Sequence, residues 1–429
     1  MEQLMHYIWQ HRLLSLTHCS TVDHRPVRII DPGLPNTNAG PDFFNAKIEI
    51  DGHLWVGNVE IHTRASDWKR HHHHLDKAYD SVILHVVEKD DAPVYRTNGE
   101  LIPQMVLNYS PHFISQYHSL VRSHSSLPCA STLQHTPSIT IAQWIQSLAF
   151  ERLQAKASRI THLHQSFAGS WEDTCYVTLA RNLGFGINND AFERLALHTP
   201  LRILHKHCDS ILQVEALLFG QAGMLDSTQH PHDTYYQQLC SEYTFLANKF
   251  SLTPLDSHVW KSFRTRPQNF PHRRIATLAQ FIVDGFRLME NILQAPHEDA
   301  LRQLFSIHLT GYWATHYSFA DTATTTTHKA LGDSSIHIIL INTVAPLYYA
   351  YATHTGNPHI ADRAISLLES LRPEKNSIVT LFTRAGIQCP DALTSQALIQ
   401  AKREYCDPRK CIYCTIGHRL LSHAATSHK

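Results

Sequence analysis

The chain lacks any net charge bias, because its 37 Lys and Arg residues balance its 37 Asp and Glu residues. A balanced chain has no global attraction for nucleic acid, so any such binding must come from a local patch. Histidine is in excess instead, with 34 residues among 429, and these side chains would become positive on modest acidification. We interpret this excess as compositional drift rather than as a pH sensor.

Long hydrophobic runs are also scarce. The most apolar stretch, 336–352, contains His337, Asn342 and Pro346, and it is shorter than the roughly 20 apolar residues that span a bilayer. It predicts a buried, proline-kinked helix rather than a membrane span. The first residues have neither the cationic start nor the small-residue cleavage site of a secretion signal. We therefore expect a cytoplasmic protein without a membrane partner.

Cysteine is sparse, with nine residues that are scattered singly until the last three. An odd number of scattered cysteines argues against a disulfide framework and for reduced thiols. The last three stand close together, as Cys406, Cys411 and Cys414. Three thiolates and one further ligand suit tetrahedral Zn²⁺, and three or four thiolates suit an iron-sulfur cluster. The sequence therefore predicts a C-terminal metal site.

The fourth ligand of this metal site remains open. His418 follows Cys414 by four residues, which places both on one face if the segment is helical. The candidates are His418, Cys389 and Cys129. The alternative interpretation is a set of free thiols near a frayed terminus.

The character of the expected elements changes along the chain. Residues 1–108 contain one amphipathic helix, at 2–16, and strands at 27–31, 44–50, 55–62, 81–87 and near 93–97 and 101–107. Residues 109–139 are rich in Ser and Pro and read as a linker. Apolar residues at helical spacing predict a helical domain over 140–388 and a helical tail over 389–429. We therefore expect an α+β N-terminal domain followed by a mostly α-helical domain.

Acidic and imidazole side chains converge in the N-terminal hairpin. Asp42 follows a Gly-Pro turn at the start of one strand, and Glu60 and His62 share one face of the next strand. Two carboxylates brought together in this way can chelate Mg²⁺ or Mn²⁺. We therefore predict Asp42 and Glu60 as metal ligands. The alternative is that Asp42 caps the turn and Glu60 pairs with Arg64 on the surface.

Further histidines follow the hairpin. His85 interrupts an apolar strand, and a buried imidazole needs a partner. Adjacent members of the histidine run at 71–74 cannot all face one ion. A transition metal held by several of these side chains is an additional hypothesis, with the ligands His62, His72, Asp76 and His85.

At these residues the chain resembles the PD-(D/E)XK nuclease superfamily. Pro41-Asp42 stands for the PD element, and Glu60-Ile61-His62 for the acidic-x-Lys element. The resemblance implies a restriction-endonuclease-like core, in which the two acids and the carbonyl of the x residue hold Mg²⁺ and the Lys positions or activates water. His62 stands at the Lys position here, and an imidazole can be neutral and bind metal.

The whole chain also resembles a bacterial family of unknown function, through signatures that run from IDPG and GPDF through GNVEIH to the terminal cysteine cluster. That resemblance implies no activity.

A basic stretch lies within the expected helical domain. Residues 257–283 contain no Asp or Glu, and aromatic residues are interleaved with the cations. The cations are Lys261, Arg264, Arg266, Arg273 and Arg274. Cations neutralise phosphates and aromatic rings stack on bases, so this stretch predicts contact with DNA or RNA. In the alternative, the aromatic rings are buried and the arginines pair with acids elsewhere.

The leading hypothesis is a metal-dependent phosphodiesterase of the nuclease type, a hydrolase with Asp42, Glu60 and His62 as its catalytic residues. The alternative is a non-catalytic nucleic-acid-binding or scaffold protein, with a degenerate nuclease fold and a structural C-terminal metal. The sequence leaves open the substrate, the metals and the oligomeric state.

Overall fold

The computed structural model describes residues 1–14, 19–262, 266–319, 321–322, 326 and 328–426. The chain forms two compact units. Unit 1 contains Met1–Trp144, Leu381–Ile387 and Ala401–Lys429, and unit 2 contains Ile145–Thr380 and Gln388–Gln400. The C-terminal segment therefore belongs to the same unit as the N-terminal sheet, although the main segment of unit 2 lies between them in sequence.

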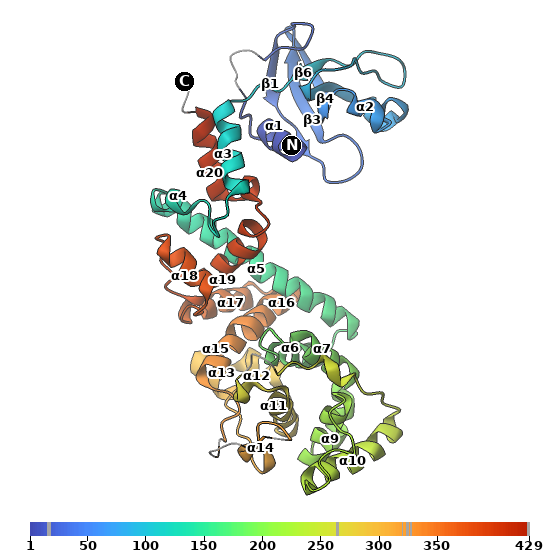
Figure 1. Cartoon of the computed structure of the whole chain (residues 1–429), viewed down its shortest axis with the longest axis vertical. Coiled ribbons are helices and arrows are strands. Elements are labelled where there is room, and N and C mark those ends of the chain that lie inside the picture. Colours follow the sequence, from blue (N-terminus) through green and yellow to red (C-terminus); the bar gives the residue numbers. More distant parts are fainter. Residues whose placement is uncertain (15–18, 263–265, 320, 323–325, 327, 427–429) are drawn as a thin grey trace. The chain divides into compact units, whose positions relative to one another are not determined.

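Unit 1 contains a mixed six-stranded sheet with the order β1-β3-β4-β5-β6, and β2 pairs with β3 at the side of this path (Figure 1). The strands are β1 Val27–Asp31, β2 Leu34–Pro35, β3 Phe43–Ile50, β4 His53–Arg64, β5 Val82–Lys89 and β6 Gln104–Val106. Neighbours are antiparallel from β1 to β4 and parallel from β4 to β6. The expected hairpin is confirmed. The expected strand near 101–107 is present only as β6, and the expected strand near 93–97 is represented only by an isolated bridge between Tyr95 and Leu101.

Helix α1, Glu2–Gln10, covers one face of this sheet (Figure 1). Its buried residues, including Leu4 and Ile8, join Val59 and Ile61 of β4 in one hydrophobic core. Since successive residues of a strand face opposite sides, burying Val59 and Ile61 turns Glu60 and His62 to the other face of β4.

The parallel pairing of β4 with β5 needs a crossover connection. That connection carries the histidine run and consists of three short helices, α2 Asp67–Arg70, η2 His73–Leu75 and η3 Lys77–Tyr79. The backbone reverses at His72, which adopts the left-handed conformation with φ of 63°. The polar connection is therefore a run of short helices that contact one another, and the first of them, α2, contacts β4.

The segment 109–139, which we expected to be a linker, forms two helices of unit 1. These are α3 Pro111–Arg122 and α4 Ala130–Gln134, and both contact α20, Thr415–Thr426. Phe113 and Leu120 of α3 share the core of the sheet with Leu421 of α20. The Ser-rich composition obscured this packing, because a few well-spaced apolar residues are enough to bury one helix face.

Unit 2 is helical, as expected, and has a large apolar core of its own. The boundary between the units falls within two helices, α5 Ser138–Ser166 and α18 Ser377–Arg384. The other helices of unit 2 are α6 Trp171–Leu183, α7 Asn189–His198, α8 Leu201–Leu204, η4 His205–His207, α9 Ile211–Gln221, α10 Thr234–Phe250, η5 Ser257–Val259, η6 Pro267–Asn269, α11 Pro271–Val283, α12 Leu288–Gln294, α13 Glu298–Leu304, α14 Tyr312–Thr315, α15 Asp333–Ile339, η7 Leu340–Val344, α16 Ala345–Thr355, α17 Pro358–Ser370 and α19 Ala392–Gln400. Gly285, where φ is +78°, lies between the end of α11 and the start of α12.

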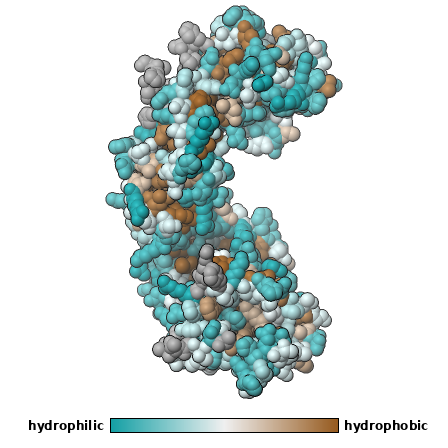
Figure 2. Space-filling view, in the orientation of Figure 1, coloured by the Kyte–Doolittle hydropathy of each residue, from teal (hydrophilic) through white to brown (hydrophobic). Residues whose placement is uncertain are grey.

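The apolar stretch 336–352 lies in the core of unit 2, within α15, the π-helical η7 and α16. The helical run Asp333–Thr355 is long and apolar enough to cross a membrane, and 67% of its most apolar window is buried inside the protein. Pro346 frees the carbonyl of Asn342 from its helical partner. That carbonyl accepts a hydrogen bond from the amide of Asn182, at 3.0 Å. On the face seen in Figure 2 the surface is mostly hydrophilic.

Candidate functional site

Asp42 and Glu60 lie next to each other on neighbouring strands. The register pairs Phe43 with Val59, which aligns the residue before β3 with the middle of β4. The backbone N–H of Asp42 donates to Oε2 of Glu60 at 3.1 Å, and Oδ2 of Asp42 accepts from the backbone N–H of Ile61 at 2.9 Å. Glu60 is 5% exposed. Glu60 therefore lies in the interior of the site beside Asp42. The surface pair between Glu60 and Arg64, which was the alternative interpretation, is not formed.

The electrostatics of this pair favour a cation. Burial, followed by the nearby charge of Asp42, raises the pKa of Glu60 to about 9. Two carboxylates that share a poorly solvated site cannot both ionise at low cost, so one keeps its proton. A bound cation would remove this penalty and allow both carboxylates to ionise.

His6 of α1 extends the acidic pair. Its Nε2 lies 3.2 Å from Oδ2 of Asp42. Burial acts to lower the pKa of His6, but the hydrogen bond and the charge of Asp42 raise it overall. Glu2, His6 and Asp42 bring three possible metal-ligand atoms within 4.8 Å of one another. Sequence reasoning missed Glu2 and His6, although their spacing of four residues on an amphipathic helix places them on one face.

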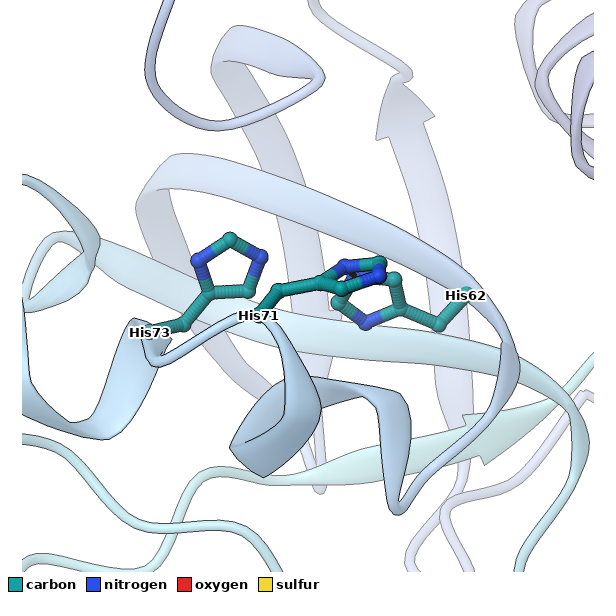
Figure 3. Close-up of side chains that lie close together, drawn as sticks. All are labelled: His62, His71 and His73. Carbon is teal, nitrogen blue, oxygen red and sulfur yellow. Dashed lines mark hydrogen bonds between the residues drawn. The ribbon is translucent and has the colours of Figure 1, made fainter.

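On the other side of Glu60 lies a cluster of imidazoles. Oε1 of Glu60 is 3.4 Å from Nε2 of His62 and 3.3 Å from Nε2 of His73. Nδ1 of His71 lies 3.2 Å from Nε2 of His62. Ligand atoms of His62, His71 and His73 all lie within 4.8 Å of one another (Figure 3). Glu60 therefore connects the group around Asp42 with three histidines from β4 and the crossover connection.

The buried imidazole of His85 has the partner that we expected, and this partner is His62. Its Nε2 lies 2.9 Å from Nδ1 of His62, from the neighbouring parallel strand β5. Burial lowers the pKa of His85 to about 3, and burial with the neighbouring histidines lowers the pKa of His62 to about 2. Both imidazoles are therefore neutral at physiological pH, which is the form that binds metal. His85 orients His62, as an outer partner orients a metal-binding histidine.

The other residues of the hypothetical transition-metal set lie elsewhere. The rings of His72 and His74 face each other, at a centroid distance of 6.3 Å, and His72 is exposed. Asp76 caps a turn, because its Oδ1 accepts from the backbone N–H of Ala78 at 2.9 Å. The structure therefore brings His71 and His73 to His62, in place of His72 and Asp76.

The model of a family described as "Protein of unknown function (DUF2851)" matches residues 2–377. The chain belongs to this family. No curated protein and no solved structure matches the chain. The matched range includes the N-terminal site in full and ends before the last three cysteines. Because the function of the family is unknown, the match supplies no activity for either candidate site.

In this DUF2851 protein the three C-terminal cysteines lie around η9, Cys411–Tyr413, with Cys406 at the end of the π-helical η8, Ala401–Cys406. His418 has other partners. Its Nδ1 lies 2.6 Å from the hydroxyl of Tyr7, and its Nε2 lies 3.3 Å from the hydroxyl of Ser422. Both of its nitrogens are therefore engaged away from the thiols. Cys389, the second candidate, donates to the carbonyl of Asp391 at 3.8 Å.

The basic stretch is partly buried. Arg273 and Arg274 are 0% and 2% exposed, and they donate to the carbonyls of Trp313 and Ala330 at 2.5 and 2.9 Å. These two guanidinium groups therefore satisfy the backbone of unit 2, with carbonyls as partners in place of the acids we expected. Lys261 and Arg266 are exposed, and their contact with nucleic acid stays a prediction. Arg264 lies outside the described residues.

Proposed function

We propose that this protein is a metal-dependent phosphodiesterase, a hydrolase that cleaves DNA or RNA at the N-terminal site. The observation that carries the proposal is the hydrogen-bonded placement of Asp42 beside Glu60, with the backbone of Ile61 between them. This is the arrangement of acids that the resemblance to PD-(D/E)XK nucleases implies.

The order of elements supports the same proposal. Helix α1 precedes the antiparallel path β1, β3 and β4, and a crossover connection then leads from β4 to the parallel strand β5. Helix α1 contributes His6, β3 begins after Asp42, β4 carries Glu60 and His62, and β5 carries His85. This order is compatible with a restriction-endonuclease-like core, and we propose that unit 1 contains one.

The donor set fits a divalent metal ion. Carboxylates from Asp42 and Glu60 are hard oxygen ligands, and the neutral His62, with the neighbouring His71 and His73, offers imidazole nitrogen. A mixed set of oxygen and nitrogen suits Mn²⁺ better than Mg²⁺, which prefers oxygen alone. When bound, such an ion would polarise a phosphoryl oxygen and promote ionisation of a bound water.

The other residues of the site position this chemistry. His85 fixes the ring of His62 through Nδ1. His6 lies beside Asp42 at the edge of the site, with its Nε2 3.2 Å from Oδ2 of Asp42. Since His62 is neutral, it cannot supply the positive charge of the usual lysine, and its proposed role is that of a ligand or an orienting group.

The test is cleavage of labelled single- and double-stranded DNA and RNA with Mn²⁺, Mg²⁺ or Zn²⁺. We expect Asp42→Asn and Glu60→Gln each to reduce Mn²⁺-dependent cleavage by at least about a hundredfold, the scale of losing one electrostatic contributor to the transition state. Glu49→Gln is the matched control, because Glu49 lies on β3 and pairs with Arg28. A wild-type protein that cleaves none of these substrates would overturn the proposal.

A second candidate is a non-catalytic nucleic-acid-binding or scaffold protein with a degenerate nuclease fold. One observation favours it: His62 is 1% exposed and neutral, so the site lacks an exposed cation at the lysine position. Calorimetry separates the two functions. The phosphodiesterase requires saturable Mn²⁺ binding that Glu60→Gln weakens, whereas the scaffold requires no metal at this site.

A further inference from the structure

Four cysteines come together in unit 1. Cys129 immediately precedes α4, Cys406 ends η8, and Cys411 and Cys414 lie at the two ends of η9. Helix α20 contacts both α4 and η9, and η8 contacts η9. The Cys406 thiol interacts electrostatically with the thiols of all three other residues. Segments that are distant in sequence therefore place four sulfur atoms in one region.

The turn that carries Cys411 and Cys414 is tight. The backbone N–H of Cys414 donates to the carbonyl of Cys411 at 3.2 Å. A Cβ atom on Gly417 would lie 2.0 Å from the same carbonyl oxygen, so α20 can approach the turn only because residue 417 is glycine. A short turn that holds two cysteines three positions apart is a recurring element of thiolate metal sites.

The surroundings of Cys414 suit a thiolate. The backbone N–H groups of Ile416 and Gly417 and the side chain of Trp144 lie beside its sulfur. Hydrogen bonds from N–H groups to a sulfur stabilise its charged form and are typical of metal-bound cysteine.

The loop between Cys406 and Cys411 is anchored near Cys129. Arg409 donates to the carbonyls of Ser123 and Ser125, at 2.8 and 2.9 Å, and its charge acts on the Cys411 thiol. The thiols of Cys414 and Cys411 also act on the Cys129 thiol. Arg409 therefore holds the cysteine loop against the segment that leads to Cys129.

We propose that Cys129, Cys406, Cys411 and Cys414 form a metal centre with four thiolate ligands, which holds either one Zn²⁺ or an iron-sulfur cluster. Of the three candidates that the sequence left open, Cys129, His418 and Cys389, we select Cys129 as the fourth ligand. This centre lies apart from the site around Asp42 and Glu60, so its existence does not depend on the proposed phosphodiesterase.

The centre would join distant parts of the chain. Cys129 precedes the main segment of unit 2 and Cys406 follows it. Closing a long loop removes conformational freedom from the unfolded chain, and this entropy grows slowly with loop length. The metal would therefore act as a cross-link that holds the C-terminal segment on unit 1.

The test is the metal content of the full-length protein, purified without oxygen and measured by elemental analysis together with acid-labile sulfide. We expect stoichiometric metal in the wild type and at least about a tenfold loss in Cys129→Ser. The matched controls Cys389→Ser and His418→Gln should keep the wild-type content. Iron with sulfide identifies a cluster, zinc alone identifies a single ion, and either supports the proposed centre.

Two results would overturn the proposal. One is wild-type metal content in Cys129→Ser. The other is a wild-type protein that holds neither zinc nor iron after incubation with Zn²⁺ or with iron and sulfide.

A ligand exchange covers the case in which Cys129→Ser does not fold. After loading with Co²⁺, the thiolate-to-cobalt absorption of Cys129→His should fall by about a quarter, because three thiolates replace four. An unchanged spectrum would exclude Cys129 as a ligand, and Cys389→Ser serves again as the control.

Discussion

Glu215 offers a quantitative test of the electrostatics of unit 2. It lies on α9 and is 4% exposed, and the hydroxyl of Tyr235 donates to its Oε2. Burial is the largest effect on this carboxyl group, and it raises the pKa to about 8 from an ordinary value of 4.5. The folded protein therefore keeps this group protonated at a pH at which the unfolded chain has already lost the proton.

This difference sets the direction of the pH dependence. Between about pH 4.5 and about pH 8 the folded state binds one more proton than the unfolded state, so its stability falls as the pH rises. Each pH unit is equivalent to about 1.4 kcal/mol, which gives a loss on the order of 5 kcal/mol over this window. Below pH 4.5 both states are protonated and the effect disappears.

The substitution Glu215→Gln isolates this effect, because glutamine has nearly the same shape and does not titrate. We expect the variant to gain stability over the wild type as the pH rises from 5 to 8, by about 1.4 kcal/mol per pH unit. The measurement is urea unfolding followed by tryptophan fluorescence. The contributions of the histidines are common to both proteins and cancel in the difference.

Glu290→Gln, at an exposed position of α12, is the matched control and should show no such trend. Parallel stability curves for the wild type and Glu215→Gln between pH 5 and 8 would refute the reasoning, since the carboxyl group would then titrate alike in both states.

Two further substitutions test packing. Tyr348→Phe removes a hydroxyl that donates to a buried carbonyl at 2.6 Å and accepts from Arg363 at 2.7 Å, so we expect a loss of about 1–3 kcal/mol in denaturant unfolding; an unchanged midpoint would contradict this. Gly417→Ala places a methyl group against the carbonyl of Cys411 and should reduce both stability and bound metal. A Cβ added at Gly332 would meet no atom within 4 Å beyond its chain neighbours, so Gly332→Ala should change neither the stability nor the bound metal. Equal behaviour of Gly417→Ala and Gly332→Ala would argue against a tight turn at Cys411.

The acidic half of the candidate site could be predicted from the sequence because it depends on local pairing. Alternating residues on both sides of Gly52 predict a hairpin, which brings Asp42 near Glu60, 18 positions away. The same alternation predicts that Glu60 and His62 share a face. The final register also depends on an irregularity between Phe43 and Ala46, which shifts the strand pairing by one residue and which periodicity does not predict.

The imidazole half could not be predicted in the same way. The four adjacent histidines have the same side chain, and the choice among them depends on the backbone. The chain reverses at His72, between α2 and η2, and this turn directs His71 and His73 toward His62. A left-handed residue within a run of identical side chains leaves no signal in the composition.

The cysteine cluster shows where a local spacing rule does not apply. The spacing of four between Cys414 and His418 would place both on one face of a helix, but Cys414 has an extended conformation, with ψ of 133°, and α20 begins after it. The helical rule therefore does not apply to this pair, and His418 contacts Tyr7 instead. Cys129 is brought to the cluster by the packing of α20 against α4, a contact between segments that are distant in sequence. The choice of Cys129 as the proposed fourth ligand thus depends on tertiary packing, and a substitution at Cys129 tests that proposal.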